Sequence, residues 1–231
     1  MAAAVNPVVF ILMKKKILLS LSLFLSIVSF AQIRYGVAAG VTSYSINGNA
    51  ADNLKQVLSF TNGMVTMGPV TGFYGGGYAN IPVSSNVSVE PGIYYSTKGY
   101  ALTGAYTIKG IDILTADATA KLRAGYIEMP VLLKGNFNGL QIFAGPQVSY
   151  LSNASVDINA GLAGINLLHS KMDVTNQINR WDVGITGGVG YQFGNGLRIT
   201  GSYERGLSKV DAGQNVKSYN QGFKIGAGIN F

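Results

Sequence analysis

The last stretch of the chain, NQGFKIGAGINF at residues 220–231, decides the fold. Its apolar residues share one parity: Phe223, Ile225, Ala227, Ile229 and Phe231. The other parity carries three glycines, Asn230 and a single charge, Lys224. Because successive side chains of a strand point to opposite faces, this alternation predicts a β-strand with one apolar face. A second face made mostly of glycine is unusual for a sheet that meets water.

The composition spreads hydrophobicity along the whole chain. The 231 residues include 31 glycines and 13 tyrosines, charged residues make up 12%, and the mean hydropathy is positive. Yet no run after residue 31 approaches the ~18 uninterrupted apolar residues of a spanning helix. Such dispersed hydrophobicity is typical of alternating strands that turn one face toward lipid. The chain has no cysteine, so disulfides and thiolate metal sites are excluded.

The first 31 residues have the pattern of an export signal. Three lysines at 14–16 precede an apolar run, and Ser29 and Ala31 are the small residues of a signal-peptidase site. We therefore expect residues 1–31 to be removed as a signal peptide, with Met13 as a possible true start. An uncleaved membrane anchor is the alternative.

The net charge of +7 falls once that segment is set aside. Removing its three lysines leaves 14 basic residues against 10 acidic residues, a net charge of +4. The remaining basic residues occur singly, not in the clusters that bind phosphate backbones. This distribution argues against nucleic acid as a partner.

The rest of the chain divides into eight stretches that alternate as the last one does. They are residues 33–45, 70–81, 87–98, 121–134, 140–151, 180–193, 197–206 and 220–231. Each is long enough for the ~9–11 residues with which a tilted strand crosses a bilayer. The connections 82–86, 135–139 and 194–196 are short and rich in Gly, Asn or Pro, whereas 46–69, 99–120, 152–179 and 207–219 are long.

Short turns at one end and long loops at the other are typical of an outer-membrane barrel. In lipid a sheet must close on itself, because every backbone N–H and C=O needs a partner there. We therefore predict an all-β fold, an eight-stranded antiparallel up-and-down transmembrane β-barrel over residues 32–231. An even strand count places both termini at the periplasmic end in the bacterial outer membrane. Within the long loops, residues 52–60 suit a short helix, and residues 159–169 either cap the barrel mouth or continue the adjacent strands.

The charged residues of the strands fall on the parity opposite the apolar face, with exceptions such as Arg205, which faces outward near the outer end of its strand. Those on the inward parity are Arg34, Glu90, Lys98, Glu128, Lys134, Asp182, Arg198, Glu204 and Lys224. Eight strands enclose a lumen that side chains just fill, and a lone charge buried there is costly. We therefore predict a luminal ion-pair network that plugs the barrel, in which Glu90 and Glu128 meet basic partners. The candidate partners are Arg198, Lys134 and Lys224.

Aromatic residues on the lipid-facing parity predict two girdles, one at each membrane interface. Tracing the strand directions places Tyr35, Tyr191, Phe193 and Phe231 at the periplasmic interface. The outer interface receives Tyr95, Tyr150, Trp181, Tyr203 and Phe223.

No catalytic or metal site emerges from the sequence. His169 is the only histidine, lies in a long loop and lacks a serine–acid pair beside it. The loop acids Asp112, Asp117, Asp157 and Asp173 are too dispersed for a calcium site. We expect no cofactor, no metal and no enzymatic activity. A catalytic set or a proton path in the lumen is the less favoured alternative.

Several segments together resemble one known family. They are GVAAGVTSYS in the first stretch, VSVEPGIYYSTKG in the third, YIEMPVLLK in the fourth, LQIFAGPQVSYL in the fifth, SYERGL in the seventh and GAGINF in the last. They resemble small outer-membrane β-barrel proteins of the PorT-like type from Gram-negative Bacteroidota, over nearly all of residues 32–231. The resemblance implies contact with outer-membrane lipid, and it implies that barrel-assembly machinery reads Phe231 as a C-terminal signal. Ser202 stands where the family usually has a basic residue, which implies a different luminal pairing.

The fold alone does not assign a role. We expect a non-enzymatic barrel whose extracellular loops form a binding or structural surface, because loops on rigid scaffolds usually carry function. Its extracellular partner is not identified by the sequence. The alternatives are a narrow transport or ligand-holding barrel, or a component of a protein-secretion assembly, to which some relatives are tied. A soluble lipocalin-like barrel is the remaining alternative.

Overall fold

The computed structural model describes residues 33–48, 65–107, 115–162, 165–211, 213 and 217–231. Its strands are β1 (Arg34–Asn47), β2 (Val65–Pro82), β3 (Val87–Thr107), β4 (Thr115–Phe137), β5 (Leu140–Leu162), β6 (Ile165–Asp173), β7 (Trp181–Gln192), β8 (Leu197–Gly206) and β9 (Tyr219–Asn230). A short 3-10 helix, η1 (Thr175–Gln177), precedes β7. The expected signal peptide at 1–31 and the expected helix at 52–60 lie outside the described residues. Within the described part of the chain, no helix is long and apolar enough to cross a membrane.

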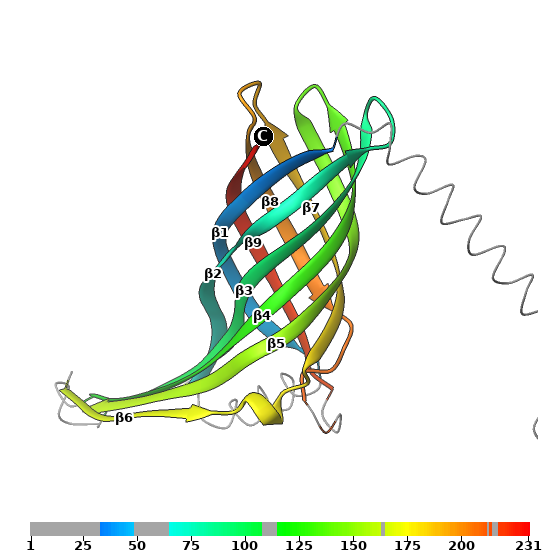
Figure 1. Cartoon of the computed structure of the whole chain (residues 1–231). Helices are drawn as coiled ribbons and strands as arrows, with labels where there is room; N and C mark the ends of the chain where they lie inside the picture. Colours follow the sequence, from blue (N-terminus) through cyan, green and yellow to red (C-terminus); the bar gives the residue numbers. More distant parts are fainter. Residues whose placement is uncertain (1–32, 49–64, 108–114, 163–164, 212, 214–216) are drawn as a thin grey trace, which may run out of the picture.

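Eight of these strands close into a ring (Figure 1). Each pairs antiparallel with its neighbours in the order β1, β2, β3, β4, β5, β7, β8, β9, and β9 pairs back with β1. The closing pairs run from Gly36 opposite Asn230 to Asn47 opposite Tyr219. The predicted eight-stranded antiparallel up-and-down barrel is confirmed. The stretch 220–231 lies in its closing strand.

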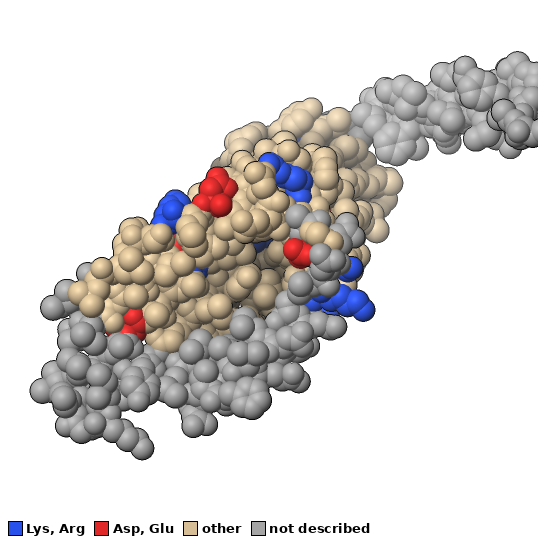
Figure 2. All heavy atoms as spheres, turned by 90° about the horizontal axis from the view of Figure 1, so that it is seen from below, with Lys and Arg blue, Asp and Glu red and all other residues tan. Residues whose placement is uncertain are grey.

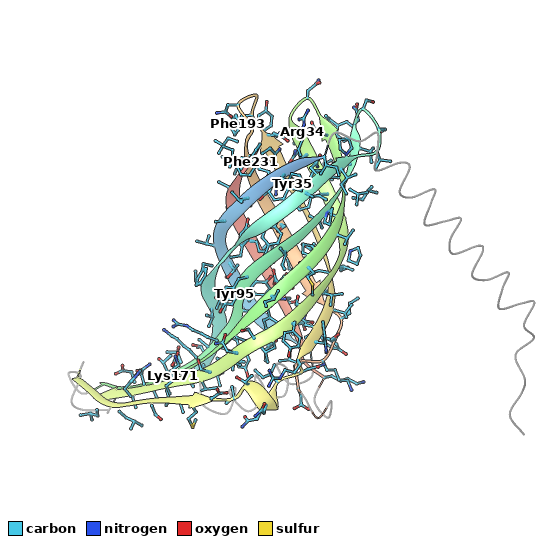
Figure 3. The ribbon with its side chains drawn as sticks, viewed as in Figure 1. Arg34, Tyr35, Tyr95, Lys171, Phe193 and Phe231 are labelled. Carbon is cyan, nitrogen blue, oxygen red and sulfur yellow. The ribbon has the colours of Figure 1, made fainter. Side chains whose placement is uncertain are left out.

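One end of the ring, the turn end, carries three tight connections. They are residues 83–86, 138–139 and 193–196. Asn138 and Gly139 have positive φ values of 52° and 92°, as in the two-residue type I′ hairpin turn. The N–H of Gly139 donates a hydrogen bond to Asn136 Oδ1 at 3.0 Å. Arg34 and Phe231, near the two ends of the described chain, also lie at this end (Figure 3).

Within the ring, apolar side chains point outward and polar side chains point inward. Strand β7 shows the rule, because Val183, Ile185 and Val189 are exposed whereas Asp182 and Thr186 are buried. A soluble protein usually buries the opposite set. The ring therefore has the polarity that a lipid environment requires.

Beyond the ring, four strands continue into a sheet where the sequence pattern predicts loops. β2, β3, β4 and β5 run past the ends of β1 and β7, and β6 pairs with the far part of β5. We call this sheet the arm; it comprises residues 65–69, 99–107, 115–123, 153–162 and 165–173. The arm bends away from the barrel axis, at the end opposite the C-terminus (Figure 1). The predicted loops 99–120 and 152–179 are therefore wrong in large part, and within 159–169 the structure favours continued strands over a cap. Of the predicted loop 46–69, residues 46–47 and 65–69 belong to strands, and residues 49–64 lie outside the described residues.

Two β-bulges lie where the arm leaves the ring. Strand β2 gains one residue on β3 within residues 69–74. In β5 the extra residue is Ser152, which has no opposite residue in β4. Leu151 and Ala154 are both buried, so the inward-facing parity changes across this bulge. A bulge also bends its strand and increases the local twist, which fits the change of direction there.

The arm reverses the polarity of the ring. Its inner face, continuous with the lumen, carries two apolar rows: Met67, Leu102, Ala120 and Ile158, then Tyr100, Leu122, Val156 and Met172. Its outer face, continuous with the lipid-facing side, carries two polar rows: Thr103, Thr119, Asn159 and His169, then Lys121, Asp157 and Lys171. Viewed from the arm end, basic and acidic side chains lie in small mixed groups rather than in one field of a single sign (Figure 2). The outer face of the arm is therefore suited to water, not to hydrocarbon.

Candidate functional site

The lumen of the ring holds two charged clusters made of residues singled out from the sequence. The turn-end cluster consists of Glu90, Lys134 and Arg198. The arm-end cluster consists of Lys98, Glu128, Asp182, Glu204 and Lys224. All eight residues are buried, with exposed fractions between 0% and 9%.

In the turn-end cluster, a single carboxylate holds two cations. Lys134 Nζ lies 2.5 Å from Glu90 Oε2. Arg198 Nη1 donates to both oxygens of the same carboxylate, at 2.9 and 2.8 Å. The Arg198 guanidinium also stacks over the ring of Tyr78, 3.6 Å from its centroid. Arg198 is therefore fixed by charge-assisted hydrogen bonds from one nitrogen on one side and by an aromatic face on the other.

In the arm-end cluster, two lysines share three carboxylates. Lys98 Nζ pairs with Glu204, lies 3.2 Å from Glu128 Oε1 and lies 3.4 Å from Asp182 Oδ2. Lys224 Nζ pairs with Glu128 and lies 3.1 Å from Glu204 Oε2. Because each lysine contacts at least two carboxylates, the five side chains form one connected network.

Two neutral side chains complete the arm-end cluster. Tyr44 Oη donates to Glu204 Oε2 at 2.5 Å, and Asn220 Nδ2 donates to Asp182 Oδ2 at 2.8 Å. Neither residue was singled out from the sequence. Parity could have found both, because Tyr44 shares the inward parity of Arg34 and Asn220 shares that of Lys224.

The charges of the two clusters balance only when taken together. The turn-end cluster has two cations and one carboxylate, and the arm-end cluster has two cations and three carboxylates. The buried charges of the described residues are therefore four positive and four negative. One positive charge in excess sits near the turn end, and one negative charge in excess sits near the arm end.

Arg34 stays outside these clusters. It is exposed at the start of β1, at the turn end of the ring (Figure 3). Among the described residues no ion pair links it to the luminal charges. The inward parity of β1 reaches the open end of the barrel here, so water solvates the guanidinium instead of a carboxylate.

An apolar layer covers the arm-end mouth of the lumen. It consists of Ala124, Tyr126, Leu151, Ala154 and Ile178, with Leu122, Val174 and Val210 packed against it. Ile178, which follows η1, forms a β-bridge with Asp211. The N–H of Ala154 donates to Thr175 Oγ1 at 2.9 Å, which attaches η1 to β5. The layer adjoins the arm-end cluster, because Lys98 Nζ lies 5.0 Å from the ring centroid of Tyr126.

The aromatic residues named from the sequence are all exposed on the outside of the ring, from 36% for Tyr150 to 73% for Phe231. Tyr35, Phe193 and Phe231 lie at the turn end, and Tyr95 lies nearer the arm (Figure 3). Three pairs of rings touch, with centroids 4.9–5.0 Å apart: Tyr150 with Trp181, Tyr203 with Phe223, and Tyr191 with Phe193. Phe73, which is absent from the sequence-based set, packs against Tyr95 at 5.8 Å.

A cavity of about 60 Å³ lies in the lumen between the two clusters. Its lining includes all three residues of the turn-end cluster, and Lys224 from the arm-end cluster. Over the described ranges, no group of three His, Asp or Glu side chains could hold a metal ion.

Comparisons with known proteins bear on this architecture. Over residues 30–212 the sequence matches the family described as "Outer membrane protein beta-barrel domain". A search of curated protein sequences gave no match.

Among solved structures, this chain is similar to Neisserial surface protein A (NspA), with 12% identity, a TM-score of 0.48, and coverage of 85% of this chain and 97% of that one. It is also similar to Ail, the attachment invasion locus protein of Yersinia pestis, with 12% identity, a TM-score of 0.39, and coverage of 86% and 98%. A third similar structure is the outer membrane protease OmpT from Escherichia coli, with 11% identity, a TM-score of 0.34, and coverage of 87% and 96%. Likeness at this level assigns no role.

The family match extends over most of the chain, and the closed ring with apolar outer strands is the architecture that such a domain requires. The family is broader than the PorT-like type, which stays a prediction from the sequence motifs. The chain belongs to the outer membrane protein beta-barrel domain family, and its place is the bacterial outer membrane.

Proposed function

We propose that this protein is a non-enzymatic outer-membrane barrel with a plugged lumen, and that the arm and adjoining loops form an extracellular binding or structural surface. The observation that carries the proposal is the reversed polarity of the arm. Strands β3, β4 and β5 contain 21, 23 and 23 residues, about twice the ~9–11 that a crossing strand needs. Their outer face turns polar beyond the ring. Spanning the membrane would not require this extra sheet.

The plugged lumen is supported by the two charged clusters. Every luminal carboxylate is ion-paired, and the arm-end mouth is covered by the apolar layer. An ion crossing the lumen would have to separate buried partners. Breaking a buried pair so that one charge is left alone costs about 3–5 kcal/mol. Conduction is therefore disfavoured.

The orientation that we propose places both termini in the periplasm and the arm outside the cell. Outer-membrane barrels have short periplasmic turns and longer extracellular segments, and Arg34 and Phe231 lie at the turn end. Cleavage after Ala31 would leave the mature N-terminus on that side. Phe231 would then be accessible there to barrel-assembly machinery, and the exposed aromatic residues would form girdles against lipid. Because the arm bends away from the axis, its polar outer face would turn back toward the lipid headgroups.

We propose that the protein has no enzymatic activity because its luminal carboxylates are inaccessible. The luminal carboxylates are buried and ion-paired, so a substrate could not approach them. On the arm, the described contact of His169 Nδ1 is with Asn159 Oδ1 at 2.6 Å. An amide does not polarise an imidazole as the acid of a catalytic triad does.

One alternative keeps a specific observation in its favour. A ligand-holding barrel would use the luminal cavity of about 60 Å³, which has room for a very small ligand only. A role in a secretion assembly rests on the PorT-like resemblance alone.

The proposed surface can be tested with two methionines as matched positions. A photo-crosslinking amino acid is placed at Met172, on the inner face of the arm, or at Met129, on the lipid-facing side of β4; the residues are 47% and 37% exposed. In intact cells we expect a discrete protein or glycan adduct from position 172 and lipid adducts alone from position 129. Lipid adducts alone from both positions would overturn the binding surface. Planar-bilayer conductance above background would overturn the plugged lumen.

A further inference from the structure

The cavity in the lumen has walls of unequal charge. Three cations line it, Lys134, Arg198 and Lys224, against one carboxylate, Glu90. Thr200 and Ser202 add hydroxyl groups. All three cations are at least nine-tenths buried, with exposed fractions of 2%, 4% and 9%. The wall of the cavity therefore carries a surplus of positive charge.

The excess charge has different neighbours in the two clusters. The excess negative charge of the arm-end cluster is met by dedicated donors, the hydroxyl of Tyr44 at 2.5 Å and the amide of Asn220 at 2.8 Å. The excess positive charge of the turn-end cluster faces the aromatic rings of Tyr78 and Phe143, at 3.6 Å from Arg198 and 5.6 Å from Lys134. Aromatic faces attract a cation only weakly compared with an anion. What this cluster lacks is a second acceptor.

The donors for such an acceptor are present. Arg198 Nε is buried without a hydrogen-bond partner among the described residues. Lys134 has three N–H donors, and Glu90 Oε2 is the acceptor recorded for it, at 2.5 Å. Lys224 approaches the cavity from the other cluster. Buried cations with unused donors around one cavity are what an anion site requires.

We propose that this cavity binds one monovalent anion of halide size, held by Lys134 and Arg198 with Lys224 on the opposite wall. On the measure by which one water needs about 10–15 Å³, the space of about 60 Å³ holds a halide ion with a few waters. The bound anion neutralises the turn-end cluster, which Glu90 alone leaves with one positive charge.

The direct test is diffraction from the wild-type protein refolded in sodium bromide, because refolding lets the cavity load while the barrel closes. Bromide scatters anomalously near its absorption edge. We expect an anomalous peak in the lumen within hydrogen-bond distance of Lys134 Nζ. Peaks confined to exposed basic residues such as Lys171, or no luminal peak, would overturn the proposal.

The second test is stability in urea, which brings no halide of its own as guanidinium chloride does. Sodium bromide and sodium gluconate are compared at equal ionic strength. A ligand that binds only the folded state raises the unfolding midpoint progressively with its concentration. We expect that bromide-dependent rise in wild type and in the arm variant Lys171→Met, and its loss in Lys134→Met. A rise of equal size in Lys134→Met would contradict the site, and if this variant does not fold, the bromide diffraction decides.

The outcome is separable from that of the proposed function. The halide site depends on the cavity and its cations, whereas the extracellular surface depends on the arm. A luminal bromide peak with no protein or glycan adduct at position 172 would support the halide site and reject the binding surface. An adduct at position 172 with no luminal peak would support the surface and reject the halide site.

Discussion

The ring and the arm are built from the same strands, yet they present opposite faces to their surroundings. Along β4, Ile127, Met129 and Val131 point outward in the ring, and Lys121 and Arg123 point outward in the arm. No strand ends between the two sets. We infer that the surroundings change instead, because an apolar outer face suits hydrocarbon around the ring and a polar outer face suits water around the arm. In such a strand, the polarity of the outward-facing side chains indicates the membrane boundary better than the ends of the strand do.

The largest expected effect on stability comes from the charged inner face of the ring. Replacing Glu90 with Leu leaves Lys134 and Arg198 without their carboxylate. We expect a loss of about 3–5 kcal/mol in the free energy of unfolding, because removing one partner strands buried charge. Urea unfolding in vesicles measures it. The triple variant Glu90→Leu, Lys134→Met, Arg198→Leu recovers most of the loss, and a single variant as stable as wild type would show that the cluster is solvated.

The outer faces of ring and arm give the next largest contrast. Ile225, 62% exposed in the middle of β9, is replaced with Arg, and Thr103 on the outer face of the arm is replaced with Arg as the control. A charge near the bilayer midplane costs about 2–4 kcal/mol, whereas an exposed surface substitution stays within about 0.5 kcal/mol. Unfolding in lipid vesicles measures both. Equal costs at the two positions would mean that the arm is also embedded in lipid.

The bulge at Ser152 separates the ring part of β5 from its arm part, so its role can be tested within one strand. Deleting Ser152 removes the extra residue and shifts the rest of β5 by one position. A one-residue shift turns every side chain to the other face, so Val156 and Ile158 would face outward beside Lys171. We expect hydrogen exchange to accelerate in β6 and the far part of β5 while the ring keeps its protection. Unchanged protection in β6 would show that the bulge does not set the register of the arm.

The smallest expected effect concerns the contact between Asp173, at the end of β6 in the arm, and Thr175 in η1. Asp173 Oδ1 accepts the N–H of Thr175 at 2.8 Å, and this backbone hydrogen bond holds the pKa of Asp173 below its usual value. A lowered carboxyl pKa stabilises the folded state above the unfolded pKa of about 3.9, and the contribution is lost as the pH falls through the folded pKa. We expect amide exchange at Thr175, corrected for its intrinsic pH dependence, to gain protection above that pH. Asp173→Ala removes this dependence, and a dependence retained in the variant would assign it to another group.

Much of the ring could be predicted from the sequence because lipid imposes strict rules. Alternation, closure and short turns follow from backbone satisfaction and strand geometry, and the buried charges share one parity with few exceptions. The predicted partners Lys134, Arg198 and Lys224 do pair with Glu90 or Glu128, but which acid each cation contacts was harder to predict. Glu90 and Glu128 take partners from strands β4, β8 and β9 as well as β3, and parity alone does not fix which charges lie at the same depth.

Apart from the alternative of continued strands at 159–169, the arm was not predicted, for two physical reasons. Its strands keep the period of two, but a search for apolar residues on the outer face finds Lys121 and Asp157 there instead. The bulge at Ser152 then moves the apolar residues of β5 from one parity to the other. Tyr44 was missed for a simpler reason: it lies on the inward parity, but the predicted network was assembled from charged side chains only.

Closure of the ring has a consequence for the order of events in folding. Asn47 and Gln221, whose side chains are hydrogen bonded at 3.0 Å, are 174 residues apart in the chain. Contacts of such separation form slowly, because the loop that joins them must be closed first. Until β9 pairs with β1, the edge of β1 stays unpaired, and any other strand could pair with it. A factor that shields the β1 edge during this interval would therefore raise the yield of closed barrels without altering their final stability.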